Sequence, residues 1–152
     1  MTREMEVRDY LRGDEPLDEL APGGIYADSE LSVEGISEAA GMPDVWLNNV
    51  FQTTIVVRER AAVPTGDLQS TRTQRTSMSQ VIEVWVYGLT SEAVQAALDR
   101  VYALLMGKRL AKAFSATWVG GSPLIPAPEL PSGTFTRHED YRIVTIRRPV
   151  TA

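Results

Sequence analysis

The stretch from Val81 to Leu110 constrains the fold of this chain more than any other. Residues 81–87 are β-branched or aromatic except for Glu83, a composition typical of a strand covered on both faces or nearly so. Apolar residues then recur at three- and four-residue spacing from Val94 to Leu105, which places them on one stripe of a helix. Thr90 is expected to cap this helix by accepting from the free backbone N–H groups of its first turn. The sequence therefore predicts a central strand followed by an amphipathic helix.

Shorter patterns predict the remaining elements. Extended segments are expected at 25–27, 53–57, 114–119 and 141–147. Helices are expected at 1–12 and 32–40, each followed by a glycine. The acidic residues from Asp14 to Glu19 are expected to form a solvated linker, because Pro16 opposes continuation of the first helix.

Two long segments, Ala61–Ser79 and Gly120–Gly133, are predicted to be loops. The first is polar and far longer than a hairpin turn, so it is either a mobile loop or an arm that reaches a neighbouring subunit. The strands at its two ends are expected to pair antiparallel. The second contains four prolines, which cannot donate to a sheet, and its apolar residues indicate docking on another surface.

These elements predict a single α+β domain over residues 1–152. We expect a mostly antiparallel sheet of about four strands, with one long helix and one or two shorter helices packed on one face. An N-terminal helix and acidic segment occupy residues 1–44, and the α/β core occupies 45–152. No run approaches the roughly 20 apolar residues that a membrane helix requires, so no membrane partner is expected.

The charge of the chain is unevenly distributed. Residues 1–44 hold three basic and twelve acidic residues, a net charge of −9, whereas residues 45–152 carry +4. Two interpretations stay open: a solvated acidic surface, or complementary ends, in which the acidic segment of one copy meets the basic surface of another. The acidic total argues against tight binding of a phosphate backbone.

Residues suited to catalysis or metal binding are scarce in this sequence. The chain has no cysteine, and its single histidine, His138, is expected to lie on the surface. Glu83 is expected to be exposed or at an interface, paired with an arginine of an adjacent strand such as Arg142. A catalytic role for Glu83 would require a second acid beside it, which the sequence does not indicate. We therefore expect no enzyme activity, no metal site and no cofactor.

Two short segments carry a family likeness: Asp99-Arg100-Val101-Tyr102, with Leu105 after it, and Asp140-Tyr141-Arg142 at the start of the last predicted strand. These two segments, together with the order of the predicted elements over roughly residues 45–148, carry a resemblance to a known family. The chain resembles the tail terminator, or tail-completion, proteins of long-tailed bacteriophages and related gene-transfer particles.

This resemblance implies a ring, usually of six copies, on the end of the tail tube. The ring stops tube polymerisation and offers the surface to which the head attaches. The implied partners are other copies of the chain, the tail tube protein and a head–tail connector or stopper protein, and DNA passes through the lumen without specific binding. The implied location is the tail–neck junction of the virion, after synthesis in the host cytoplasm.

Residues expected at subunit or tube interfaces are charged or apolar and lie at strand ends or in the two loops. They are Arg58, Arg60, Asp67, Arg72, Arg75, Leu124, Ile125, Leu130 and Arg142. Two alternatives stay open. One is another neck component, either a head-closure or a tube-like protein. The other is a small-ligand-binding α/β domain or enzyme that uses the sheet face around Glu83 and Trp85.

Overall fold

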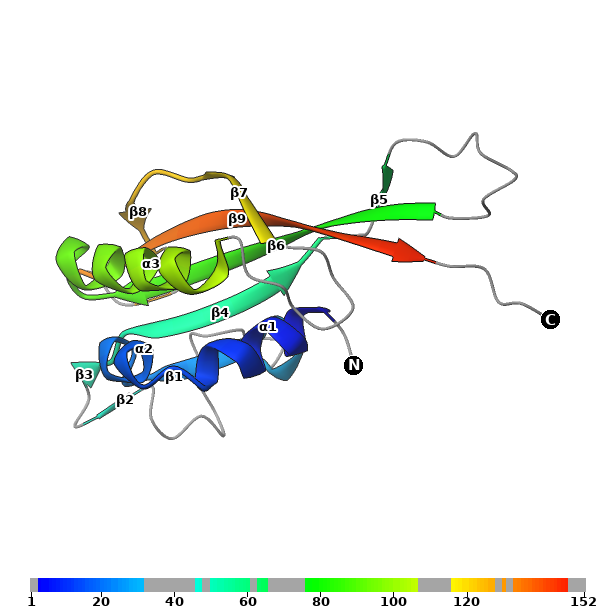
Figure 1. Cartoon of the computed structure of the whole chain (residues 1–152). Coiled ribbons are helices and arrows are strands. Elements are labelled where there is room, and N and C mark those ends of the chain that lie inside the picture. The colour runs from blue at the N-terminus through cyan, green and yellow to red at the C-terminus, as the bar shows by residue number, and fades with distance from the viewer. Residues whose placement is uncertain are drawn as a thin grey trace.

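A mixed sheet covered on one face by helices forms the fold (Figure 1). The computed structural model describes residues 3–31, 46–47, 50–60, 63–65, 76–106, 116–127, 130 and 133–147. In these ranges the main path of the sheet runs in the order β1 (Gly24–Ala27), β4 (Thr54–Glu59), β6 (Thr76–Gly88), β9 (Phe135–Arg147) and β7 (Ala116–Gly121). Two short strands complete it, β5 (Val63–Thr65) on β6 and β8 (Ile125–Pro126) on β9.

The sheet has seven strands among the described residues, so the expected count of about four was too low. The additional strands are short, and they are extended because they pair with the long strands β6 and β9. Strand β1 pairs parallel with β4, and the other pairings in this sheet are antiparallel in the described residues. The antiparallel pairing of β4 with β6 was predicted and is confirmed. A separate small hairpin joins β2 (Trp46–Leu47) to β3 (Val50–Phe51).

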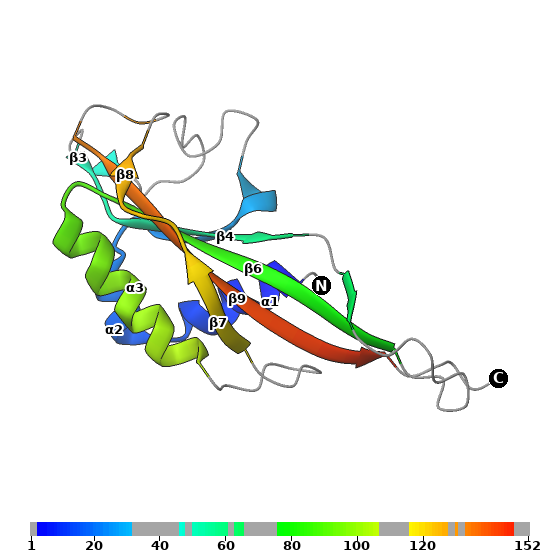
Figure 2. The same cartoon turned by 90° about the horizontal axis from the view of Figure 1, so that it is seen from above.

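The longest pairing joins β6 to β9 without interruption from Thr76 opposite Arg147 to Gly88 opposite Phe135. Both strands are longer than predicted, because the residues added to the predicted strands, 76–80 of β6 and 135–140 of β9, lack the apolar run that identifies a strand in the sequence. The ends that carry Thr76 and Arg147 extend beyond the helices as a twisted arm, to which β5 adds a short third strand (Figure 2).

The described helices are α1 (Arg3–Arg12), α2 (Glu15–Leu20) and α3 (Ser91–Leu105), and a short 3-10 helix, η1, spans Asp28–Glu30. The three α-helices lie on the same face of the sheet (Figure 2). The predicted stripe of α3 is confirmed, since Val94, Leu98 and Leu105 are buried in the same cluster as the β6 residues Ile82, Val84 and Val86. The predicted cap is also confirmed, because Thr90 Oγ1 accepts from the Ala93 backbone N–H at 3.1 Å.

The predicted linker after α1 is instead a helix. Asp14 caps α2 by accepting from the Leu17 backbone N–H at 3.0 Å, and Pro16 lies in the first turn, where its missing N–H has no cost. Asp14 also accepts two hydrogen bonds from Arg100 of α3, at 2.8 and 2.7 Å. This paired contact lowers the pKa of Asp14 and joins α2 to α3.

The face of the sheet opposite the helices, called here the open face, is covered at one end. There a second apolar cluster gathers around Tyr87 and Val56, with Phe51, Ala127 and Leu130. The helix predicted at 32–40 and most of the 61–79 loop lie outside the described residues. No helix in the described ranges is both long enough and apolar enough to cross a membrane.

Leu98 provides a test of the core between α3 and the sheet. It is fully buried, so Leu98→Ala is expected to lower the free energy of unfolding by about 2–5 kcal/mol, and Leu98→Asp is expected to unfold the domain because it buries an unpaired charge. Tyr102→Ala, at a 44% exposed position on the same helix, is the control. Urea unfolding followed by circular dichroism measures both. Equal stability of Leu98→Ala and Tyr102→Ala would contradict this packing.

The contact between Asp14 and Arg100 predicts a pH-dependent stability. Because the folded-state pKa of Asp14 is lowered, mainly by the hydrogen bonds from Arg100, the stability it contributes is present above the unfolded-state pKa of about 3.9 and is lost as the pH falls through the lower, folded-state value. Asp14→Asn keeps the helix cap and removes the charge. Urea unfolding should show the variant less stable than wild type at neutral pH, with the difference shrinking in acid.

Asp18→Asn, at an exposed position of the same helix, is the control and should change stability little at either pH. An unchanged difference between wild type and Asp14→Asn from neutral to acid pH would contradict the prediction.

Candidate functional site

The open face holds three of the predicted interface residues. Arg58 lies on β4, Arg60 directly follows that strand, and Arg142 lies on β9 opposite Val81. Alternation along the strands places these side chains on the face that the helices leave uncovered. The structure thus places Arg142 on the same face of the sheet as Arg58 and Arg60, from which it is distant in the sequence.

The other predicted residues are dispersed. Leu124, directly before β8, and Ile125, the first residue of β8, are exposed, whereas Leu130 is buried in the apolar cluster of the open face. The three remaining predictions, Asp67, Arg72 and Arg75, lie outside the described residues.

A network of charged and aromatic side chains, called here the open-face ladder, crosses the three central strands. It consists of Arg58, Arg60, Glu83, Trp85, His138 and Asp140. Trp85 is at its centre: the Arg58 guanidinium lies 4.9 Å from the indole centroid, and the His138 ring stacks on the indole with the centroids 4.3 Å apart. The Trp85 indole N–H donates to Glu83 at 3.0 Å. The aromatic residues are therefore fixed in orientation by charged neighbours.

Arg60 bridges two carboxylates that face each other across the strands. Glu83 and Asp140 are direct partners in the β6–β9 register. The Arg60 side chain donates to Glu83 at 2.5 Å and to Asp140 at 3.3 Å. The partner of Glu83 is therefore Arg60 and not Arg142, which lies two pairs further along β9, opposite Val81. Like charges directly opposite each other are destabilising, so the cation between them stabilises the sheet.

The electrostatics of the ladder keep Glu83 ionised. Burial of the carboxylate raises its pKa, but the hydrogen bonds from Trp85 and Arg60 together outweigh burial, so the pKa of Glu83 lies below its ordinary value. The same contact raises the pKa of Arg60. A carboxylate with a lowered pKa serves as a hydrogen-bond acceptor and is not a proton donor at neutral pH.

The ladder contains a histidine and an aspartate near a serine, but not in the geometry of a nucleophilic triad. His138 Nδ1 lies 2.7 Å from Asp140, and Ser122 Oγ accepts from the backbone N–H of His138 at 3.0 Å. A triad requires the serine hydroxyl to contact the imidazole itself. The His138 side chain is 17% exposed, less than expected for a surface histidine, because it stacks on Trp85.

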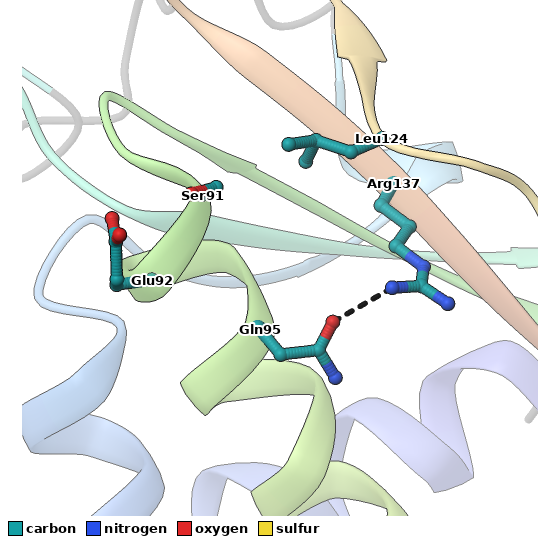
Figure 3. A pocket seen from close by; sticks show the side chains of 5 residues that line it. All are labelled: Ser91, Glu92, Gln95, Leu124 and Arg137. Atoms are coloured by element: carbon teal, nitrogen blue, oxygen red, sulfur yellow. Dashed lines mark hydrogen bonds between the residues drawn. The ribbon is translucent and has the colours of Figure 1, made fainter.

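A shallow pocket of about 340 Å³ lies near the exposed Leu124 (Figure 3). Its lining comes from the start of α3, from β9 and from Leu124. Arg137 donates to the Gln95 side-chain oxygen at 2.7 Å, which connects β9 to α3 beside the pocket. In the part of the chain that the structure describes, acidic and histidine side chains form no group of three or more suited to a metal ion.

His138, Asp140 and Arg137 were missed by sequence reasoning, because the last strand was predicted to begin at Tyr141. Residues 136–140 are all polar or charged, so the sequence carries no apolar alternation that could have identified this end of the strand. Once this strand is placed opposite 81–87, alternate residues fall on the open face.

Comparisons with known proteins bear on the fold. No protein-family model matches the chain, and no curated protein matches it. Among solved structures, the chain is similar to a chain from a structure described as the virion of a native gene transfer agent particle. That match has a TM-score of 0.59 and 15% sequence identity, and it covers 96% of each chain. The likeness shows that the two chains share a fold over almost their full length.

The bridge formed by Arg60 is testable in a double-mutant cycle. Arg60→Ala is expected to destabilise the wild-type protein and to have a smaller effect in a Glu83→Gln background, where the repulsion across the strands is already relieved. Each effect is expected to be about 1 kcal/mol or less, because the Arg60 side chain is 53% exposed. Urea unfolding of the four proteins gives the coupling. Arg142→Ala, on the same face, is the control, and an equal cost of Arg60→Ala in both backgrounds would contradict the bridge.

Proposed function

We propose that this chain is a structural protein of a virion. In this role it forms a ring that caps the tail tube, ends tube polymerisation and provides the surface for head attachment. The observation that carries the proposal is the likeness, over 96% of both chains, to a chain of a gene transfer agent virion. The order of strands and helices that resembles the tail terminator family supports it from the sequence.

The shape of the subunit suits this role. A closed ring of identical copies requires each copy to present two different complementary surfaces. Here the sheet ends in two different strands, β1 on one side and β7 on the other. The arm formed by the outer halves of β6 and β9 extends beyond the helices and provides a means of reaching the tube or the connector (Figure 2).

The open-face ladder is proposed to act as a rigid contact surface in this assembly. Its charged groups are held by one another, and its aromatic rings are stacked, so little side-chain freedom is lost when a partner binds. We propose a role in assembly without enzyme activity. The partners are other copies of the chain, the tail tube protein and a head–tail connector or stopper protein.

The second candidate function is that of another neck component, such as a head-closure or tube-like protein. The fold likeness to a chain of the gene transfer agent virion supports this function as much as it supports the tail terminator function. An experiment with the tail tube protein of the same particle distinguishes the two candidate functions. A tail terminator binds the end of a growing tube and limits its length, whereas a head-closure protein leaves tube length unchanged.

The test combines light scattering with tube growth. The purified chain, alone or after contact with tail tube protein, is expected to form a closed oligomer of several copies, and its addition to polymerising tube protein is expected to shorten the tubes. A chain that stays monomeric under both conditions and leaves tube length unchanged would contradict the proposal. A closed oligomer without an effect on tube length would favour the second candidate.

A further inference from the structure

We propose that the pocket beside the start of α3 binds a carboxylate presented by a neighbouring protein of the assembly. Arg137 of β9 is the residue that pairs with this carboxylate, and Leu124 packs against the apolar group next to it. The inference rests on the proposed function for the identity of the partner, whereas the chemistry of the pocket follows from the subunit alone.

Arg137 is a partly buried arginine without a counter-ion. Its side chain forms no ion pair with a described residue, and its Nε atom is enclosed without a hydrogen-bond partner. Arg142 also lacks a counter-ion, but it is exposed to water. A charge that is partly removed from water and has no counter-ion is destabilising, so Arg137 is suited to receive one from outside. The other arginines whose side chains the structure describes each pair with a carboxylate; they are Arg3, Arg8, Arg12, Arg58, Arg60 and Arg100.

The neighbours of Arg137 hold its side chain without neutralising it. Arg137 Nη1 donates to the Gln95 side-chain oxygen at 2.7 Å, and the Gln95 amide nitrogen donates to Asp99 at 2.7 Å. This second contact fixes the amide with its oxygen toward Arg137. Glu139 lies two residues further on the same face of β9, but it is buried, forms no ion pair with Arg137, and accepts from the Tyr141 hydroxyl at 3.4 Å. The guanidinium is therefore oriented by a neutral amide and keeps its charge for a ligand.

The pocket gives a ligand access to this charge. Figure 3 shows Leu124 beside the Arg137 side chain, and Glu92 on the far side of the pocket, away from the guanidinium. The Ser91 hydroxyl has no hydrogen-bond partner among the described residues and is free to donate. A cation, a hydroxyl and an exposed apolar side chain in one pocket suit a carboxylate that has an apolar group next to it.

The shape of the pocket favours a carboxylate carried by a protein. Sites for free small molecules ordinarily bury most of the surface of the ligand, whereas this pocket is shallow. An acidic side chain or a C-terminal carboxylate needs only its end in the pocket, because the adjoining surface holds the rest of the partner. Ile125, which follows Leu124, is 41% exposed and provides apolar surface for such a contact.

A titration with 4-methylpentanoate, an apolar carboxylate, tests the chemistry of the pocket. Nitrogen-15 NMR resolves the Arg137 Nε–H signal and the Gln95 side-chain amide. We expect both signals to shift saturably, with a Kd in the millimolar range because the ligand is small. The isosteric 4-methylpentanamide should bind about tenfold more weakly or less, since it lacks the charge. Equal binding of the acid and the amide, or an unmoved Arg137 signal, would overturn the proposal.

Single substitutions locate the binding charge. Arg137→Gln should weaken binding of 4-methylpentanoate about tenfold or more. Glu92→Gln should strengthen it, because a like charge at the rim of the pocket is removed. Arg142→Gln, on the same strand but on the opposite face of the sheet, is the control and should bind like wild type. Equal losses in Arg137→Gln and Arg142→Gln would contradict the assignment of the site.

An exchange of side chains keeps the test valid even if Arg137→Gln does not fold. Gln95→Glu combined with Asp99→Asn moves a carboxylate from an exposed position to the side chain that contacts Arg137, without a change in net charge. This internal carboxylate should occupy the guanidinium and weaken binding of 4-methylpentanoate about tenfold or more. Circular dichroism and urea unfolding check that the variant is folded. Undiminished binding to the folded variant would overturn the proposal.

Assembly assays identify the source of the carboxylate. Arg137→Gln and the exchange variant should bind one of the proposed partners several times more weakly than wild type does, and Asp99→Asn alone, which leaves Arg137 unpaired, is the control. If the variants bind every partner like wild type, the protein source is wrong and the proposed function stands. If wild type binds neither itself nor any partner, the proposed function and the protein source are both overturned, and the titration still decides the chemistry of the pocket.

Discussion

The pairing of β6 with β9 is the constraint on which the rest of the structure depends. Thirteen residue pairs join the two strands, and the other strands of the sheet attach to this ribbon directly or through β4. Its inner half carries the alternation that separates the faces: Ile82, Val84 and Val86 pack under the helices, whereas Glu83 and Trp85 lie on the open face. A shift of one residue in this register would move every side chain of β6 to the wrong face. The core and the open-face ladder therefore depend on the same set of hydrogen bonds.

The two faces divide the tasks of stability and contact. The helix-covered face holds the larger apolar cluster, and burial of that cluster stabilises the subunit. The open face is apolar at one end and polar toward the arm. There the Arg60 side chain donates hydrogen bonds to the carboxylates of Glu83 and Asp140, which face each other across the strands. The sheet edges add a third kind of surface, because β7 exposes Trp118 and Val119 without a protecting charge. A subunit with a stable core, a rigid polar face and an unprotected edge is suited to assembly with other chains.

Sequence reasoning succeeded where one local pattern determines one element. The spacing of apolar residues identified α3 and its cap, and the run at 81–87 identified the inner half of β6. It failed where the structure depends on a distant partner: the outer half of β6 is extended because it pairs with β9, and Asp14 belongs to a helix that Arg100 of α3 helps to hold. The site shows the same division. Arg58 and Arg60 were identified from the sequence as charged residues at a strand end. The pairing of Glu83 with Arg60 was not predicted. The stacking of His138 on Trp85 was not predicted either, because it depends on a cross-strand register that no local pattern contains.

The central claim is that this chain functions by assembling with copies of itself and with neighbouring virion proteins. A cryo-electron microscopy map of the neck of the particle that contains it tests this claim most directly. The account predicts a closed ring of this chain, seated on the end of the tail tube and joined side by side through unlike surfaces. A map in which the chain is a single copy, or lies away from the tail–neck junction, would contradict it.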